Sequence, residues 1–392
     1  MSELKPFTEL LSAIVDNRGR TCPTTEEGIP LIATNCINND ALYPTYEKAR
    51  YVSQATYDAW FRGHPEPGDI IFVTKGSPGR VCMAPDPIDF CIAQDMVAVR
   101  PDPNKVYPKY LFAALRSYQV QQAIGNMHVG TLIPHFKKGD FDKLSIPVPE
   151  TGVQEVIGDM YFSLSAKIEQ NRHTNETLEA MAQAIFNSWF VDFDPVRAKA
   201  SELVRENALE IGDGYRAKND ELGDEGLPFI RAMNLKNGFD TTGADRLKPD
   251  CMAGALSKCS RVGDVAFTSK GTIGRFARVG EATEAFVYSP QVCYWRTLDS
   301  ERLHPAILYC WMQSDDFLTQ LHGRSGQTDM APYVSLRDQR GMFIPRFDAS
   351  QAEVGRKIAP LLDLVSENQA ESHTLSILRD TLLPKLLSGE LS

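Results

Sequence analysis

The chain has 392 residues, of which 43% are hydrophobic and 23% are charged, and its formal net charge is −10 at pH 7. This composition is typical of globular proteins, and no apolar run approaches the ~20 residues of a membrane span. Residues 1–6 contain no signal-peptide core, so we expect a cytoplasmic protein without a membrane partner. The acidic balance argues against a chain coated in basic residues, but it allows local positive surfaces.

Residues 1–150 are predicted to form an α/β domain with short strands. Runs of β-branched and aromatic residues, bounded by Gly, Pro and Asp, lie at 31–34, 69–74 and 96–99. A helix is predicted from Pro108 to Ile124, because proline is favoured at the start of a helix and Gly125 follows its end.

A loop with two glycines follows the second predicted strand. Its candidate contact residues are Lys75, Gly76, Ser77, Gly79 and Arg80. The glycines permit a close approach of the backbone to a ligand and predict exposed N–H groups, while the two basic side chains suit phosphates or base edges. The alternative is a hairpin turn with solvated basic side chains. The pattern is neither a P-loop nor a dinucleotide-binding motif.

A second candidate contact segment covers residues 127–138. It combines basic and hydroxyl side chains around an aromatic residue, a mixture that contacts phosphates and base edges in DNA-binding proteins. The candidates are His128, Thr131, His135, Lys137 and Lys138. The alternative is an ordinary polar connection before the last strand of the domain.

Residues 153–189 are predicted to form one long helix with an apolar stripe, because apolar residues recur every three or four positions. At about 1.5 Å per residue, these 37 residues would span about 55 Å. A rod of this length rarely serves a single globular core, so we expect it to pack along a second rod. Pro195 is predicted to stop the helix. The charged and glycine-rich residues 201–226 are predicted to form an irregular linker.

The second half of the chain repeats the first. Residues 68–80 match residues 263–275 at a shift of 195, and Ile168 and Val365 lie 197 residues apart. A shift that drifts by a few residues is what loop insertions leave in two copies of one domain. The predicted order is therefore a first domain at 1–150, a helical spacer at 151–200, a second domain at 201–347 and a second helical spacer at 348–392.

The repeat brings both candidate contact regions back. The second glycine loop offers Lys270, Gly271, Thr272, Gly274 and Arg275, and the second segment offers Arg324, Ser325, Gln327 and Thr328. The segments at 127–138 and 322–333 keep their place but differ in side chains. Two copies with one scaffold and different polar loops could bind two different sequences.

The predicted fold class is α/β (α+β), with two pseudo-twofold-related globular domains separated by two long antiparallel coiled-coil helices. Residues 350–353 offer a capping box for the last helix, and Pro384 is predicted to end its regular part. The apolar residues expected at the helix interface or against partners are Ile157, Leu164, Ile168, Leu178, Ile185, Ile358, Leu362, Val365, Leu375 and Leu382.

Sequence motifs for catalysis are missing. The chain has no HExxH or GxSxG motif, and its eight cysteines occur singly, without the spacing of a zinc site. Residues 329–333 bear a weak likeness to an amino-methyltransferase motif, but the first proline of that motif and a cofactor loop are missing. We therefore predict no catalytic, cofactor-binding or metal-binding residue.

The duplicated domain-and-helix arrangement, the two glycine loops and residues 189–197 closing the first helix together resemble the specificity subunit of type I restriction-modification systems. The resemblance covers essentially the whole chain and rests on the combination, because no single motif is diagnostic. It implies a non-catalytic subunit whose two target-recognition domains each bind one half of a bipartite double-stranded DNA sequence. The candidate contact residues above fall where DNA contacts are expected.

The same resemblance implies partner subunits. Two DNA methyltransferase subunits would dock on the helices and supply S-adenosylmethionine chemistry on adenine, and a restriction subunit would add translocation and cleavage with ATP and Mg²⁺. Two alternatives stay open: a helical scaffold that tethers proteins without reading DNA, and a stand-alone methyltransferase or nuclease.

Overall fold

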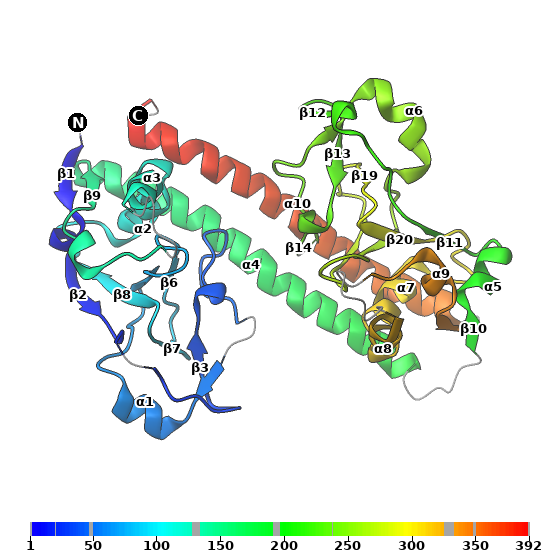
Figure 1. Ribbon diagram of the computed structural model, residues 1–392, viewed down its shortest axis with the longest axis horizontal. Coiled ribbons are helices and arrows are strands. Elements are labelled where there is room, and N and C mark those ends of the chain that lie inside the picture. Colours follow the sequence, from blue (N-terminus) through cyan, green and yellow to red (C-terminus); the bar gives the residue numbers. More distant parts are fainter. Residues whose placement is uncertain are drawn as a thin grey trace. The chain divides into compact units, whose positions relative to one another are not determined.

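The computed structural model describes residues 2–19, 21–46, 50–127, 134–190, 197–236, 238–324, 333–347 and 350–390. The chain divides into two compact units. Unit 1 comprises Met1–Gln170 and Thr374–Ser392, and unit 2 comprises Asn171–His373. Each unit contains one globular lobe, a part of the long helix α4 (Thr151–Phe190) and a part of the long helix α10 (Ser350–Ser388) (Figure 1).

Unit 1 is built around a four-stranded antiparallel sheet. Its strands, in sheet order, are β2 (Leu11–Val15), β8 (Met96–Pro101), β5 (Ile70–Val73) and β6 (Val81–Met83). A smaller sheet contains β4 (Arg50–Val52), β3 (Ile29–Ile32) and β7 (Cys91–Ile92), and β1 (Glu3–Pro6) pairs with β9 (Ser145–Val148). The three predicted strands are confirmed as β3, β5 and β8.

Unit 2 repeats this topology. Its main sheet contains β11 (Leu209–Gly212), β20 (Val292–Thr297), β17 (Val265–Thr268) and β18 (Phe276–Arg278) in the same order. The parallel pair β3 and β7 returns as β13 (Leu227–Ile230) and β19 (Val287–Tyr288), and the pair β1 and β9 returns as β10 (Arg197–Lys199) and β21 (Phe343–Pro345). Strand β4 returns as β16 (Arg246–Leu247), which pairs antiparallel with β13 as β4 does with β3. Unit 2 adds β12 (Leu222–Gly223), β14 (Leu235–Lys236) and β15 (Gly238–Phe239). The repeat seen in the sequence is a repeat of folds.

The prediction of an irregular linker at 201–226 was wrong. This stretch contains most of α5 (Ala200–Arg205) and the whole of β11, whose residues Leu209 and Ile211 are buried in the core of unit 2. The strand is short, and the charged residues around it masked its pattern. Its pairing with β20 stabilises it, which is a contact from outside the stretch itself.

The single helix predicted at 108–124 is instead two helices, α2 (Pro108–Arg116) and α3 (Tyr118–Asn126). Ser117 separates them: its hydroxyl donates to the carbonyl of Ala114 at 2.6 Å and accepts from the N–H of Val120 at 3.4 Å. Serine is a favoured N-cap because it satisfies an orphan N–H of the first turn. Ser314 makes the same break between α7 (Pro305–Met312) and α8 (Asp315–Arg324).

The long helices agree with the prediction at their starts, and α4 also agrees at its end. Helix α4 covers Thr151–Phe190 against the predicted 153–189, while Pro195 lies outside the described residues. Pro384 was wrongly predicted to end the last helix, because α10 continues to Ser388. The proline is exposed, and its neighbour Leu383 is buried in the core of unit 1, which stabilises this turn from outside the helix. In the described ranges, no helix has the length and apolar character to cross a membrane.

Helices α4 and α10 pair antiparallel within each unit. In unit 1, Leu383 of α10 shares a core with Ile157 and Tyr161 of α4, and in unit 2, Ile358 and Leu362 of α10 share a core with Phe186 of α4. The side-by-side packing of the two predicted rods is confirmed.

The interface between these helices is more polar than a continuous apolar stripe. Asn171 donates to the hydroxyl of Ser372 at 3.2 Å, and Asn368 donates to the side-chain carbonyl of Asn175 at 2.8 Å. Since Asn171 and Asn368 are 197 residues apart, as are Asn175 and Ser372, the repeat makes one hydrogen bond twice. Four members of the predicted stripe are exposed: Val153, Val156, Met181 and Trp189.

The ten predicted interface residues divide into two groups by exposure. Four are buried: Ile157, Ile358, Leu362 and Val365. Six are half-buried: Leu164, Ile168, Leu178, Ile185, Leu375 and Leu382.

Candidate nucleic-acid interface

Each glycine loop is the turn of a β-hairpin, between β5 and β6 in unit 1 and between β17 and β18 in unit 2. Gly76 and Gly79 have φ values of 82° and 93°, and Gly271 and Gly274 have φ values of 81° and 88°. L-residues with a side chain rarely adopt this conformation, which explains why the glycines recur. The two loops therefore share one backbone conformation.

The structure brings the two candidate contact regions of each unit together. In unit 1, Lys75 forms a β-bridge with His135, and the N–H of Gly76 donates to the carbonyl of Pro134 at 3.0 Å. In unit 2, Lys270 forms the equivalent bridge with Tyr333. The glycine loop and the end of the second segment thus form one surface in each copy, which we call the hairpin site.

The expected exposure of the glycine N–H groups was wrong for three of the four glycines. The N–H of Gly76 bonds Pro134, the N–H of Gly79 donates to the carbonyl of Val73 at 3.0 Å, and the N–H of Gly274 donates to the carbonyl of Thr268 at 3.2 Å. These donors are engaged within the protein and are not presented to a phosphate. The hairpin sites therefore offer side chains to a ligand, unlike an anion-binding nest of backbone amides.

The basic side chains of the hairpin sites are exposed. In unit 1 these are Lys75, Arg80, His135 and Lys137, and in unit 2 they are Lys270 and Arg275, with Thr272 exposed beside them. Ser77 is half-buried. Lys75 lies 3.8 Å from a carboxylate oxygen of Asp95, a surface contact that leaves the ammonium group accessible.

Arg324 has a different setting from the other predicted contacts. It is half-buried, and its guanidinium donates to the carbonyl of Gly341 at 2.9 Å. His128, Thr131, Ser325, Gln327, Thr328 and the side chain of Lys138 lie outside the described residues.

Arg18 in unit 1 was missed by the sequence analysis. It binds both carboxylate oxygens of Asp16, and its guanidinium lies 3.4 Å from the carbonyl of Phe136 in the second segment. Burial of Asp16 raises the pKa of its carboxyl, but the hydrogen bonds and charge of Arg18 outweigh burial and lower it overall. The Asp16 carboxylate therefore orients Arg18 beside the hairpin site.

In unit 2, Asp213 occupies the position equivalent to Asp16 and binds the ammonium group of Lys258 at 3.0 Å. Arg216 is exposed and acts electrostatically on Tyr333. The 197-residue spacing of Asp16 and Asp213 was a signal for these residues. The predicted linker at 201–226 includes Asp213 and hides this signal.

Part of the repeated motif is structural. Asp69 binds Arg100 through both carboxylate oxygens, at 2.8 and 3.0 Å, and Asp264 binds Arg296 in the same way at 2.6 and 2.8 Å. Such bidentate pairs join the start of the hairpin to the neighbouring strand of the sheet. The Gly-Asp at the start of both motifs therefore holds the hairpin and is not itself offered to a ligand.

The surroundings of the hairpin sites contain no recognisable metal centre. Within the described ranges, no group of three or more His, Cys, Asp or Glu side chains is placed to hold a metal ion. What the sites present is exposed positive charge on a rigid turn, which suits a polyanion.

Comparison of the sequence with known proteins finds similarity to specificity subunits of type I restriction enzymes. Residues 14–180 match the type I restriction modification DNA specificity domain. The chain is 24% identical over 375 residues to the MjaIX specificity subunit of Methanocaldococcus jannaschii, covering 90% of this chain and 84% of that protein. It is 32% identical over 189 residues to the HindI specificity subunit of Haemophilus influenzae, covering 47% of this chain and 38% of that protein.

A solved structure has the same fold. The S subunit of a type I restriction-modification system from M. genitalium superposes with a TM-score of 0.58, covering 98% of this chain and 96% of that chain, at 18% identity. The two-domain arrangement with long helices is thus a known architecture.

Proposed function

We propose that the chain is a DNA specificity subunit of a type I restriction-modification system and that each of its two units reads one half of a bipartite DNA target. The match of residues 14–180 to the specificity domain and the similarity to two specificity subunits support this proposal. In this role the chain is the specificity component and not a catalytic component of its complex. Within unit 1 the contacts come from the hairpin site at Lys75, Arg80, His135 and Lys137, and within unit 2 from Lys270 and Arg275.

One observation carries this proposal. The two hairpin sites have the same backbone, with matched glycine φ values and matched bridges to the second segment, but different side chains at the bridge, His135 in one copy and Tyr333 in the other. Lysine and arginine contacts to phosphates position a protein on DNA, and side chains that reach base edges provide specificity. A shared frame with different side chains is suited to reading two unlike half-sites.

The paired helices serve as the spacer in this proposal. Helix α4 has 40 residues and a length of about 60 Å, compared with about 34 Å for one turn of B-DNA. A rod of this length could hold two half-site readers more than one turn apart. The same helices would dock two methyltransferase subunits, which supply S-adenosylmethionine chemistry on adenine, and a restriction subunit would add ATP-dependent and Mg²⁺-dependent cleavage.

Exchange of one domain tests the proposal. Residues 1–150 are replaced by the matching domain of another family member, and methylated adenines are mapped in a host that carries the chimera and its methyltransferase. One half of the methylated motif should change, while the other half and the gap stay the same. The matched control exchanges residues 201–347 and should change the other half. A change of both halves by either chimera would contradict the assignment.

A further inference from the structure

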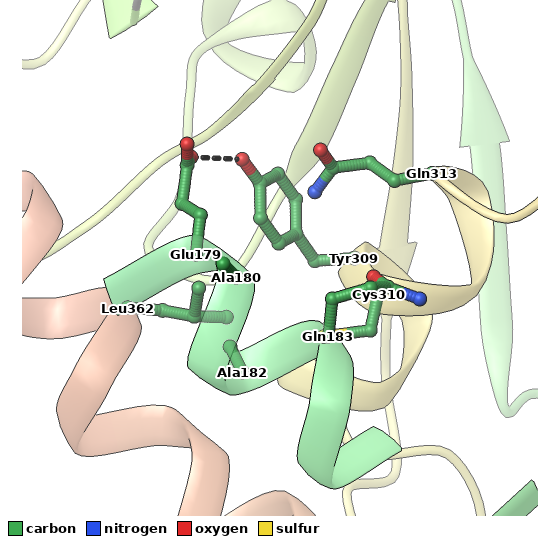
Figure 2. Close-up of a pocket in the computed structure, with 8 residues that line it drawn as sticks. All are labelled: Glu179, Ala180, Ala182, Gln183, Tyr309, Cys310, Gln313 and Leu362. Carbon is green, nitrogen blue, oxygen red and sulfur yellow. Dashed lines mark hydrogen bonds between the residues drawn. The ribbon is translucent and has the colours of Figure 1, made fainter. Parts of the chain in front are cut away.

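Unit 2 contains a pocket between its helices. It has a volume of about 230 Å³. Its lining comes from α4, from α7 with the residue that follows it, and from α10, namely Glu179, Ala180, Ala182, Gln183, Tyr309, Cys310, Gln313 and Leu362 (Figure 2). A water molecule in the liquid takes about 30 Å³, so the pocket could hold several waters or one long side chain. Ala180 at its edge is exposed, which makes the pocket reachable from outside.

Glu179 is the charged group of this pocket. Its carboxylate accepts a hydrogen bond from the hydroxyl of Tyr309 at 2.9 Å (Figure 2). Burial raises the pKa of Glu179, the hydrogen bond from Tyr309 lowers it in part, and the nearby negative charge of Glu176 raises it further. No cation is among these influences. A half-buried carboxylate without a positive partner is unfavourable, and a cationic ligand would relieve this cost.

Unit 1 shows what fills the equivalent place in the other copy. The two units can be aligned on their helices at a shift of 197 residues by contacts found in both. Gln154 accepts a hydrogen bond from the N–H of Tyr107 at 2.8 Å, and Gln351 accepts one from the N–H of His304 at 2.8 Å. Gly158 likewise packs tightly against α2, as Gly355 does against His304.

This alignment places Ala182 of unit 2 at the position of Arg379 in unit 1, and Gln313 at the position of Arg116. The guanidinium of Arg379 is buried, lies 5.3 Å from the centre of the Tyr161 ring and donates to Asp380 at 2.8 Å. Arg116 is also enclosed by protein and acts electrostatically on Arg379. Unit 1 therefore fills with two arginines the region in which unit 2 has an alanine, a glutamine and a pocket.

The charge of the two regions also differs. Unit 2 has Glu179 where unit 1 has Ser376, so the copy without the two arginines carries an acid in the same region. A guanidinium group that entered the pocket could pair with this carboxylate, while the side-chain oxygens of Gln183 and Gln313 could accept further hydrogen bonds. The pocket is thus complementary to an arginine side chain in volume, charge and hydrogen bonding.

We propose that the unit 2 pocket receives an arginine side chain of a methyltransferase subunit docked on the helices. The inference rests on the proposed function, because it supplies one anchoring contact for the partner proposed there. Unit 1 has its own arginines in the equivalent region, so this contact exists on one side of the pseudo-symmetric molecule. It distinguishes the docking site of one methyltransferase subunit from that of the other.

The test uses Ala182→Arg, which introduces into unit 2 the side chain that unit 1 has at this position. The matched control is Ala184→Arg, which adds the same charge to an exposed position of the same helix. Two quantities are measured on the full chain: the melting temperature alone, and the affinity for the methyltransferase subunit encoded with it. Ala182→Arg should raise the melting temperature, because the new side chain fills the pocket and pairs with Glu179, and it should weaken partner binding at least ten-fold.

Ala184→Arg should leave both quantities within the error of the wild type, and Glu179→Gln should weaken partner binding several-fold without lowering the melting temperature. The inference is overturned if Ala182→Arg lowers the melting temperature, binds the partner like the wild type, or behaves like Ala184→Arg. If the wild-type chain does not bind the methyltransferase subunit, the proposed docking fails and the inference fails with it. A melting temperature raised by Ala182→Arg would then show that the pocket still accepts a guanidinium.

Discussion

Units 1 and 2 hold their hairpins with the same contacts but differ in the structure that surrounds them. In both units a Gly-Asp turn starts the hairpin and its aspartate pairs with an arginine of the neighbouring strand. A serine separates the two short helices of each unit. A glutamine of a long helix accepts a hydrogen bond from a backbone N–H in each unit. Beyond this frame, unit 1 has helix α1 (Gln54–Trp60), while unit 2 has the short helix α6 (Met252–Ala255) and the β14–β15 pair. What recurs therefore supports the fold, and what differs is available for specificity.

The two copies also bury charge to different degrees. The Asp264 side chain is fully buried, its partner Arg296 is 5% exposed, and Asp264 accepts a further hydrogen bond from Tyr288 at 2.9 Å. In unit 1, Arg100 is 29% exposed and also binds Glu66 at 2.8 Å. The aspartate-arginine pair is therefore less exposed to solvent in unit 2 than in unit 1. Loss of one partner in unit 2 leaves the other as a buried charge.

The largest effect is expected from breaking this pair in unit 2. Asp264→Ala should lower the free energy of unfolding by about 3–5 kcal/mol, because it leaves the Arg296 guanidinium buried without its main acceptor. Asp69→Ala, the matched change in unit 1, should cost about 1–3 kcal/mol, since Arg100 keeps Glu66 at 2.8 Å and contact with water, whereas the buried Arg296 would keep only the longer carboxylate contact of 3.4 Å with Glu210. Urea denaturation of both variants measures the difference. Equal losses would show that the two pairs are energetically alike.

A smaller effect is expected from the lysines of the hairpin sites. Lys270→Ala should weaken DNA binding by the assembled complex on the order of three- to ten-fold and reduce the salt slope of binding by about one. Lys75→Ala should have a weaker effect, because Asp95 already offsets part of its charge, whereas the neutral Gln291 occupies the position equivalent to Asp95 in unit 2.

Binding is measured at several salt concentrations with the complex of specificity and methyltransferase subunits. Lys5→Ala on β1, whose ammonium group pairs with Glu3 at 3.4 Å, serves as the control outside both sites. A control variant that loses as much affinity as Lys270→Ala would show that the loss reflects net charge alone.

The smallest effect is the pH dependence that His304 contributes to the stability of unit 2. Burial lowers the pKa of His304 below its ordinary value of 6.5, and the charges of Arg278 and Arg356 lower it further. The folded state therefore disfavours the protonated ring, so stability is complete above about pH 6.5 and is lost as the pH falls below it. Tyr107 occupies the equivalent position in unit 1, and a tyrosine side chain stays neutral between pH 5 and pH 7.

His304→Tyr should reduce the loss of stability between pH 7 and pH 5, measured as the change in urea midpoint. The wild-type slope should persist in a His173→Tyr variant, because His173 is exposed on α4. An unchanged slope in His304→Tyr would assign the acid sensitivity to other groups.

Much of the architecture followed from local patterns. The start and end of α4 and the start of α10 were predicted within a few residues, because a stripe with helical period over several turns has few alternative conformations. The three strands of the first domain were found for a similar reason, since β-branched runs between Gly and Pro are locally distinctive. The repeat could be detected from the sequence alone. Insertions change the spacing between matching residues of the two copies but keep those residues in the same order.

The errors occurred where tertiary contacts outweighed local preference. Strand β11 lies in a charged stretch and forms because β20 pairs with it. Ser117 ends a helix at a position where the apolar pattern continues, because its hydroxyl can cap the next helix. The glycine N–H groups were expected to face a ligand, but Pro134, distant in sequence, accepts one of them.

The sequence by itself determined the duplication, the long helices and the two glycine loops, because each depends on spacing or on a residue type within one stretch of chain. The tertiary structure alone decided that the hairpin and the second segment form one site, that an asparagine layer joins α4 and α10, and that Arg379 is buried where Ala182 lines a pocket. These are contacts between residues far apart in the chain. The free energy of such a contact depends on burial and on the partner it meets, and neither is written in the local sequence.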